Sequence, residues 1–230
     1  MDHSDEVALR LRRAREDANL SLRELARRVE LSASALSQIE TGKSRPSVKT
    51  LYAIVSELGI SLDELFEVSG SAGRHAPTAR RRATGHDSGG HEDERYVLAS
   101  AIPLVQRADS RASLELDSGV TWQRLTASHD PDVDFLFAIY EVGGSSSSNH
   151  KLVRHSGREY GIVLTGELEV TVGFEAYRLG PGDSVSFDSQ EPHRLANRAE
   201  VPATAIWFVI GRRHSDVRTR WFGPQPAADA

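Results

Sequence analysis

Between residues 20 and 47 the chain reads LSLRELARRVELSASALSQIETGKSRPS, which has the pattern of two short amphipathic helices joined by a tight turn. Ser21 precedes the first apolar run and Glu24 follows three residues later, which is the capping-box signature of a helix start. Ser32 is the N-cap candidate for the second helix, whose apolar residues fall on one face. The stretch therefore predicts a helix-turn-helix.

The residues that this second helix leaves exposed are short or carry an amide. Glutamine suits bidentate contact with adenine, serine can bond several base edges, and an alanine methyl can contact thymine. We therefore predict that this face reads bases in the DNA major groove. The predicted base-contact residues are Ser32, Ala33, Ser34, Ser37 and Gln38.

Basic and hydroxyl residues around that helix supply the groups that bind a sugar-phosphate backbone. The loop after the helix combines a glycine stop, two cations and a serine that begins the next helix. The predicted backbone contacts are Arg23, Lys43, Ser44, Arg45 and Ser47. The net charge of −5 excludes a protein that coats nucleic acid non-specifically, so contact with DNA requires a local basic patch.

The chain of 230 residues exceeds one typical domain, and its texture divides it into three parts. Apolar periodicity predicts five short helices within residues 6–68, the last of them over 61–66. Residues 69–94 are rich in Gly, Ser, Arg, Asp and His, which predicts a flexible linker. Residues 95–222 contain short β-type runs separated by Gly, Pro and Asp turns, typical of a sandwich or barrel.

Several classes of protein are excluded by composition. The sequence contains no cysteine, which excludes disulfides, zinc fingers and thiol catalysis. It has no apolar run long enough to span a membrane, and its acidic N-terminus does not resemble a signal peptide. We expect a cytoplasmic protein with no membrane partner.

The N-terminal helices resemble the lambda-repressor-like helix-turn-helix domain of the XRE family of transcriptional regulators, over about residues 6–67. The resemblance implies base readout by the third helix, with double-stranded DNA as the partner. The alternative is a five-helix domain that no longer binds DNA and serves as a docking module for another protein.

Two segments of the C-terminal part resemble the two sequence blocks of the cupin superfamily, a jelly-roll barrel of the double-stranded β-helix type. His155, Glu159 and Gly166 match the first block, and His193 and Asn197 match the second. The whole chain is then a multidomain α + β protein: a five-helix domain, a linker and a cupin barrel.

The resemblance implies that His155, Glu159 and His193 form a two-histidine, one-carboxylate set, which suits Fe, Zn, Mn or Ni as a divalent metal. Val153 stands where the family pattern has a further histidine, so a metal-free pocket in which these groups hydrogen-bond one another is the alternative. Either pocket can hold a small-molecule effector. The aromatic residues predicted to line it are Tyr160, Trp122, Phe137 and Trp207.

These features predict a sequence-specific DNA-binding transcriptional regulator whose cupin barrel senses a small-molecule effector. Helix-turn-helix proteins bind pseudo-palindromes as two-fold dimers, so we expect a homodimer, with the barrel supplying the symmetry. The main alternative is a metal-dependent cupin enzyme, an Fe(II) oxygenase or epoxidase with an accessory helical domain. A third is a small-molecule or sugar-binding module. We predict no enzyme and assign no catalytic residue.

Overall fold

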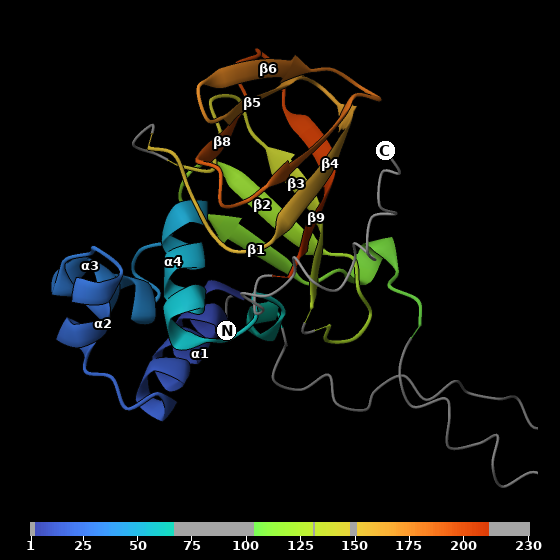
Figure 1. The fold of residues 1–230 in the computed structure, drawn as a ribbon. Coiled ribbons are helices and arrows are strands. Elements are labelled where there is room, and N and C mark those ends of the chain that lie inside the picture. Colours follow the sequence, from blue (N-terminus) through green and yellow to red (C-terminus); the bar gives the residue numbers. More distant parts are fainter. Residues whose placement is uncertain (1–2, 67–103, 131, 148–150, 212–230) are drawn as a thin grey trace, which may run out of the picture.

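The computed structural model describes residues 3–66, 104–130, 132–147 and 151–211. A helical N-terminal domain packs beneath an antiparallel β domain (Figure 1). The predicted linker at residues 69–94 lies outside the described residues, as do the predicted domain ends at 68, 95 and 222.

The N-terminal domain contains four α-helices in the described residues, and three of them begin at serine caps. The helices are α1 (His3–Asp17), α2 (Leu22–Arg28), α3 (Ala33–Glu40) and α4 (Val48–Leu58). The caps are Ser21, Ser32 and Ser47, each accepting a hydrogen bond from the backbone N–H three residues on. The predicted fifth helix is instead a short 3-10 helix, η1 (Asp63–Phe66). None of the helices in the described segments is long and apolar enough to cross a membrane.

A buried ion pair ties α1 to α3 inside this domain. Arg15 Nε lies 2.7 Å from Glu40 Oε1, and Arg15 Nη2 lies 2.8 Å from Glu40 Oε2. Arg15 also donates to the Leu20 carbonyl at 2.9 Å, so the guanidinium fixes the start of the helix-turn-helix as well. The pair is surrounded by an apolar core that includes Leu11, Leu25 and Leu36. Two charges held this closely fix α3 against α1.

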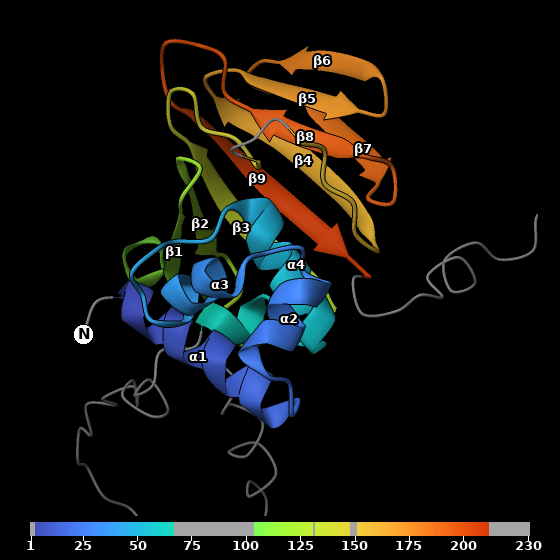
Figure 2. The same ribbon diagram turned by 90° about the vertical axis from the view of Figure 1, so that its left-hand side faces the viewer.

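The β domain consists of two antiparallel sheets, which confirms the predicted all-antiparallel C-terminal fold (Figure 2). A six-stranded sheet has the order β1-β2-β3-β9-β4-β7, and a three-stranded sheet has the order β6-β5-β8. A short 3-10 helix, η3 (Ala108–Ser110), precedes them. The strands are β1 (Ser113–Leu116), β2 (Val120–Arg124), β3 (Val133–Tyr140), β4 (Arg158–Thr165), β5 (Leu168–Val172), β6 (Glu175–Leu179), β7 (Ser184–Asp188), β8 (His193–Ala196) and β9 (Ala203–Ile210).

Side chains alternate between the two faces of the large sheet, and this alternation decides which residues reach the interior. Along β3, β4 and β9 every second residue is buried. Tyr140, Glu159 and Trp207 belong to the inward set, whereas Tyr160 and Ile162 on β4 are exposed. The alternation that buries the apolar core therefore also points these polar residues into the barrel interior.

Candidate functional site

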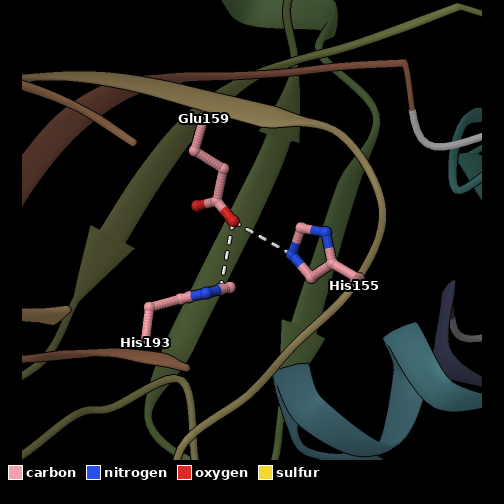
Figure 3. Close-up of side chains that lie close together, drawn as sticks. All are labelled: His155, Glu159 and His193. Atoms are coloured by element: carbon pink, nitrogen blue, oxygen red, sulfur yellow. Dashed lines mark ion pairs between the residues drawn. The ribbon is translucent and has the colours of Figure 1, made fainter. Parts of the chain in front are cut away.

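The two predicted histidines and the glutamate meet inside the β domain (Figure 3). His155 lies in the segment before β4, Glu159 is the second residue of β4, and His193 is the first residue of β8. Glu159 Oε1 lies 2.9 Å from His155 Nε2 and 3.1 Å from His193 Nε2. All three side chains are almost fully buried, so they form one compact polar cluster in an apolar interior. We call this cluster the triad.

Backbone carbonyls fix the orientation of both imidazole rings. His155 Nδ1 lies 3.0 Å from the Ser156 carbonyl, and His193 Nδ1 lies 2.8 Å from the Glu191 carbonyl. A carbonyl only accepts hydrogen bonds, so each Nδ1 carries the hydrogen and each Nε2 presents its lone pair to Glu159. The lone pair on each Nε2 and the negative carboxylate oxygen repel one another unless a metal ion or a proton lies between them.

The Glu159 carboxylate is itself held in place from its other side. Trp207 donates its indole N–H to Glu159 Oε2 at 2.7 Å. Glu159 Oε1 and His155 Nε2 are buried, and within the described part of the chain neither has a partner with hydrogen-bond geometry. Such orphaned atoms converging on one point fit a divalent cation, with His155, Glu159 and His193 as its ligands. A metal held there would supply a Lewis acid with open coordination positions.

Burial and charge act in opposite directions on the acid–base properties of the triad. Burial raises the pKa of Glu159, but attraction to the imidazoles of His155 and His193 outweighs burial and holds the pKa well below its usual range. Burial lowers the pKa of His193, but Glu159 and the Glu191 carbonyl outweigh it and raise the pKa above 6.5. The carboxylate therefore stays charged and attracts either a proton or a metal.

A small cavity adjoins the triad, and two of the four aromatic residues predicted to line it do so. Trp122 on β2 and Trp207 on β9 face this cavity. The prediction is wrong for Tyr160 and Phe137, which lie on the opposite face of the sheet. Because neighbouring strand residues point to opposite sides, an inward Glu159 forces Tyr160 outward. The same alternation turns Phe137 outward, where Arg111 covers its ring at 5.3 Å.

Several cavity residues were missed from the sequence. Tyr140 on β3 faces the triad, and its inward position follows from the alternation along that strand. Val153 also lines the cavity, at the position where the family pattern has a further histidine. His150 lies outside the described residues. Val48 and Tyr52 come from α4 of the helical domain, and no sequence signal indicates how two domains pack.

The predicted base-contact residues lie on α3 and at its N-cap. Ser32, Ser34 and Gln38 are exposed, whereas Ala33 and Ser37 are half-buried. Beneath them Leu36 and Ile39 are buried in the domain core. The structure thus places Ser34 and Gln38 on the exposed side of α3 and Ser32 at its N-cap, whereas Ala33 packs against the domain core.

The predicted backbone-contact residues are divided between two environments. Arg23 on α2 and Lys43 in the loop after α3 are exposed, and Ser44 is half-buried. Arg45 instead lies 2.6 Å from Glu115 on β1 of the barrel. Ser47 caps α4, where its Oγ accepts from the Thr50 N–H at 3.2 Å.

Comparison with known proteins relates both halves of the chain to described families. A helix-turn-helix family model matches residues 11–65, and a cupin domain model matches residues 136–209. The HTH-type transcriptional regulator PuuR of Escherichia coli (strain K12) is 26% identical over 188 residues, which cover 82% of this chain and 85% of PuuR. The chain belongs to the XRE-type helix-turn-helix regulators with a cupin domain.

Two solved structures resemble this XRE-cupin regulator along most of its length. A helix-turn-helix family transcriptional regulator from Vibrio cholerae aligns with a TM-score of 0.58 at 19% identity, over 90% of this chain and 96% of that one. This likeness shows the shared two-domain fold. Hydroxypropylphosphonic acid epoxidase from S. wedmorenis aligns with a TM-score of 0.40 at 19% identity, over 90% of this chain and 98% of that one. That second likeness assigns no activity to the XRE-cupin regulator.

Proposed function

We propose that this protein binds a pseudo-palindromic DNA operator as a homodimer and that its cupin barrel senses a small-molecule effector. The outer face of α3 carries the proposal. Ser34 and Gln38 stand exposed on a helix that is anchored by buried Leu36 and Ile39. A rigid helix with short hydroxyl and amide side chains is the form in which helix-turn-helix proteins read base edges.

Exposed cations flank this face and supply the attraction to phosphate. Lys43 follows the C-terminal end of α3, and Arg23 lies in the first turn of α2. By contrast, Arg27 and Arg28 are engaged with Glu24, at 2.8 Å in both cases. We therefore assign phosphate contact to Lys43 and Arg23 in preference to the arginines at the end of α2.

The outer face of the large sheet supplies a surface for a second copy of the chain. Tyr160, Ile162 and Leu164 on β4 are 41%, 39% and 41% exposed. Beside them, Phe135 on β3 and Phe208 on β9 stack with their ring centroids 4.1 Å apart. Monomeric proteins rarely expose a contiguous apolar patch of this kind. Two-fold packing of this face against its own copy would bury it and give the symmetry that a palindromic site requires.

The triad and its cavity are the assigned sensing site. Its three ligand atoms fit Fe, Zn, Mn or Ni, and its aromatic walls suit an organic molecule. An effector that binds one arrangement of the two domains more tightly than another would shift the population between them, and with it the affinity for DNA.

Selection of bound duplexes from a random genomic pool, at one fixed salt concentration, tests this function directly. The metal content of the same protein preparation is measured by elemental analysis. Enrichment of a pseudo-palindrome supports the regulator, and a stoichiometric metal then belongs to the sensing site. Loss of all sequence enrichment in the pool would contradict the proposal.

A metal-dependent enzyme is the second candidate, because the triad has the ligand composition of open Fe(II) sites. The enzyme hypothesis predicts stoichiometric iron, turnover of a small molecule and no enriched DNA sequence. Failure to bind both DNA and metal would instead leave a small-molecule binding module whose helical domain contacts other proteins.

A further inference from the structure

The N-terminal half of α4 lies beside the triad and its cavity. Both ribbon views show α4 beside the β domain (Figures 1 and 2), and α1 packs against β1 as well. The ring centroid of Tyr52 lies 4.7 Å from the ring centroid of His155 and 5.3 Å from that of Trp122. Val48, one turn earlier, lines the same cavity. A helix of the DNA-binding domain therefore forms one wall of the sensing site.

Backbone hydrogen bonds join the two domains around this wall. The Lys49 N–H donates to the Ser146 carbonyl at 3.1 Å, and the Asp117 N–H donates to the Pro46 carbonyl at 3.1 Å. Pro46 and Ser146 are both buried. Ser146 is in turn bonded to β8, because its Oγ accepts from the Leu195 N–H at 3.0 Å. The contact is thus a defined seam that runs from the start of α4 to the strand that carries His193.

The cavity that remains beneath Tyr52 measures about 20 Å³. A cavity of this size admits roughly one water molecule. Sites for organic ligands have volumes of about 300–1,000 Å³. An organic effector therefore cannot occupy the site while Tyr52 is seated, and its entry requires α4 to move away from His155 and Trp122.

The same seam engages Arg45, which the sequence assigns to the DNA backbone, and pairs it with Glu115 of β1 at 2.6 Å. It also engages the N-terminal turn of α4, where the Lys49 N–H donates to the Ser146 carbonyl. A cationic side chain and the free N–H groups of a helix N-terminus are groups that bind phosphate. Ser34 and Gln38 on α3 remain exposed in this arrangement. The barrel therefore engages Arg45 and the N-terminal turn of α4 while it leaves the exposed side of α3 uncovered.

We propose that α4 is a lid on the sensing site, and that entry of a ring-sized organic ligand and release of residues 45–49 to DNA are one event. The release of residues 45–49 to DNA rests on the proposed function, whereas the lid role of α4 rests only on the cavity. The ligand would replace Tyr52 against the imidazole of His155 and the indole of Trp122. By linkage, ligand and DNA each favour the undocked arrangement, so each raises the affinity of the protein for the other.

A reversible cross-link across the seam tests both halves in the full chain. The double variant Arg45→Cys/Glu115→Cys places two thiols at an exposed ion pair, and the sequence contains no other cysteine. A short bismaleimide with a disulfide in its spacer joins them, and reductant opens the link. The probes are a random-sequence duplex at fixed salt and carbethoxylation of His155 in metal-free protein, read by peptide mass spectrometry.

We expect the linked protein to bind the duplex about tenfold more weakly than after reduction. We also expect His155 to react more slowly while the link is closed. The matched control is Arg28→Cys/Glu57→Cys, which replaces an exposed Arg–Glu pair 2.8 Å apart within the helical domain. Linking that pair holds α2 to α4 without crossing the seam, and it should change neither measurement.

The outcomes separate the two proposals. Equal DNA affinity before and after reduction overturns the competition between barrel and DNA. Equal reactivity of His155 overturns the lid. Absence of duplex binding in both states contradicts the proposed function, and the His155 rates then still decide the lid. A cross-link that joins two chains, seen as a dimer on a denaturing gel, overturns docking of α4 on its own barrel.

Discussion

The indole N–H of Trp207 on β9 donates a 2.7 Å hydrogen bond to Glu159 Oε2 on β4, which leaves Oε1 to face both imidazoles of the triad. The indole lies across the neighbouring strand at Gly161, where any Cβ would collide with its six-membered ring. Trp207 thus sets the rotation of the carboxylate, and Gly161 makes room for Trp207. Carboxylate orientation of this kind supports metal affinity without direct contact to the metal.

Replacing Trp207 with phenylalanine should weaken metal binding by roughly 10- to 100-fold, because the carboxylate loses the donor that holds it. Titration of the metal-free variant with Zn(II) against a competing chelator measures the change. Trp122→Phe is the control, since Trp122 lines the same cavity from β2. Equal losses in both variants would show that cavity packing, and not the hydrogen bond, supports the site.

The stability of the metal-free protein should depend on pH through the triad. Because the pKa of His193 is raised above 6.5, its contribution is fully present below pH 6.5 and is lost as the pH rises through the folded-state pKa. The pKa of Glu159 is lowered, so its contribution is present above pH 4.5 and is lost as the pH falls through the folded-state pKa. We expect Tm to be highest between these values and to decline above pH 6.5.

Thermal unfolding in the presence of a chelator, at a series of pH values, measures this profile. Added Zn(II) should remove the decline above pH 6.5, because the metal replaces the proton and binds deprotonated ligands. Glu159→Gln should also reduce the decline of Tm above pH 6.5, since His193 then has no charged partner within the triad. A decline that persists unchanged in Glu159→Gln must arise from groups elsewhere in the protein.

The Arg15–Glu40 pair should contribute to the stability of the helical domain more than any exposed ion pair near it. Breaking a buried pair by removing one partner costs about 3–5 kcal/mol, because the other charge is left buried. Glu40→Gln should therefore lower the free energy of unfolding by an amount in that range, measured by urea denaturation. Glu57→Gln is the control, because its 2.8 Å contact with Arg28 is exposed and does not involve Arg15.

The helical domain was largely predictable because its signals are local. Each serine cap lies within a few residues of the apolar run that it starts, so Ser21, Ser32 and Ser47 could be located from the sequence. Glu40 could not be assigned, because its partner is 25 residues away and a glutamate at a helix end usually faces solvent. The short fifth helix predicted over residues 61–66 is a 3-10 helix over Asp63–Phe66, since a segment this short gains little from α-helical hydrogen bonds.

The barrel was predicted in its class and in its triad, but not in the walls of its cavity. His155, Glu159 and His193 were predicted from the resemblance to the two cupin sequence blocks, and the structure brings them together. Tyr160 and Phe137 were misplaced because aromatic composition alone does not say which face of a strand a residue occupies. The face follows from counting along the strand: Tyr160 comes one residue after the inward Glu159, and Phe137 comes one residue after a buried position of β3. Tyr52 had no signal at all, since its position depends on how the two domains pack.

Base readout and backbone attraction should be separable by substitution at two exposed positions. Gln38→Ala should reduce discrimination between the preferred operator and a random duplex by about 1–3 kcal/mol. Lys43→Ala should weaken binding to every sequence and lower the slope of log affinity against log salt by about 1. Both are measured by titration of the two duplexes at several salt concentrations. Identical losses for the two variants would contradict this division of roles.

The proposed homodimer should depend on the outer face of the large sheet. Tyr160→Lys places a charge in the centre of the apolar surface formed with Ile162 and Phe208, so burial against a second copy becomes unfavourable. We expect sedimentation to show a monomer, together with weaker binding to a two-half-site operator and unchanged binding to a single half-site. Tyr177→Lys is the matched control, because Tyr177 is 51% exposed on β6 of the other sheet. If Tyr177→Lys dissociates the dimer and Tyr160→Lys does not, the interface belongs to the small sheet instead.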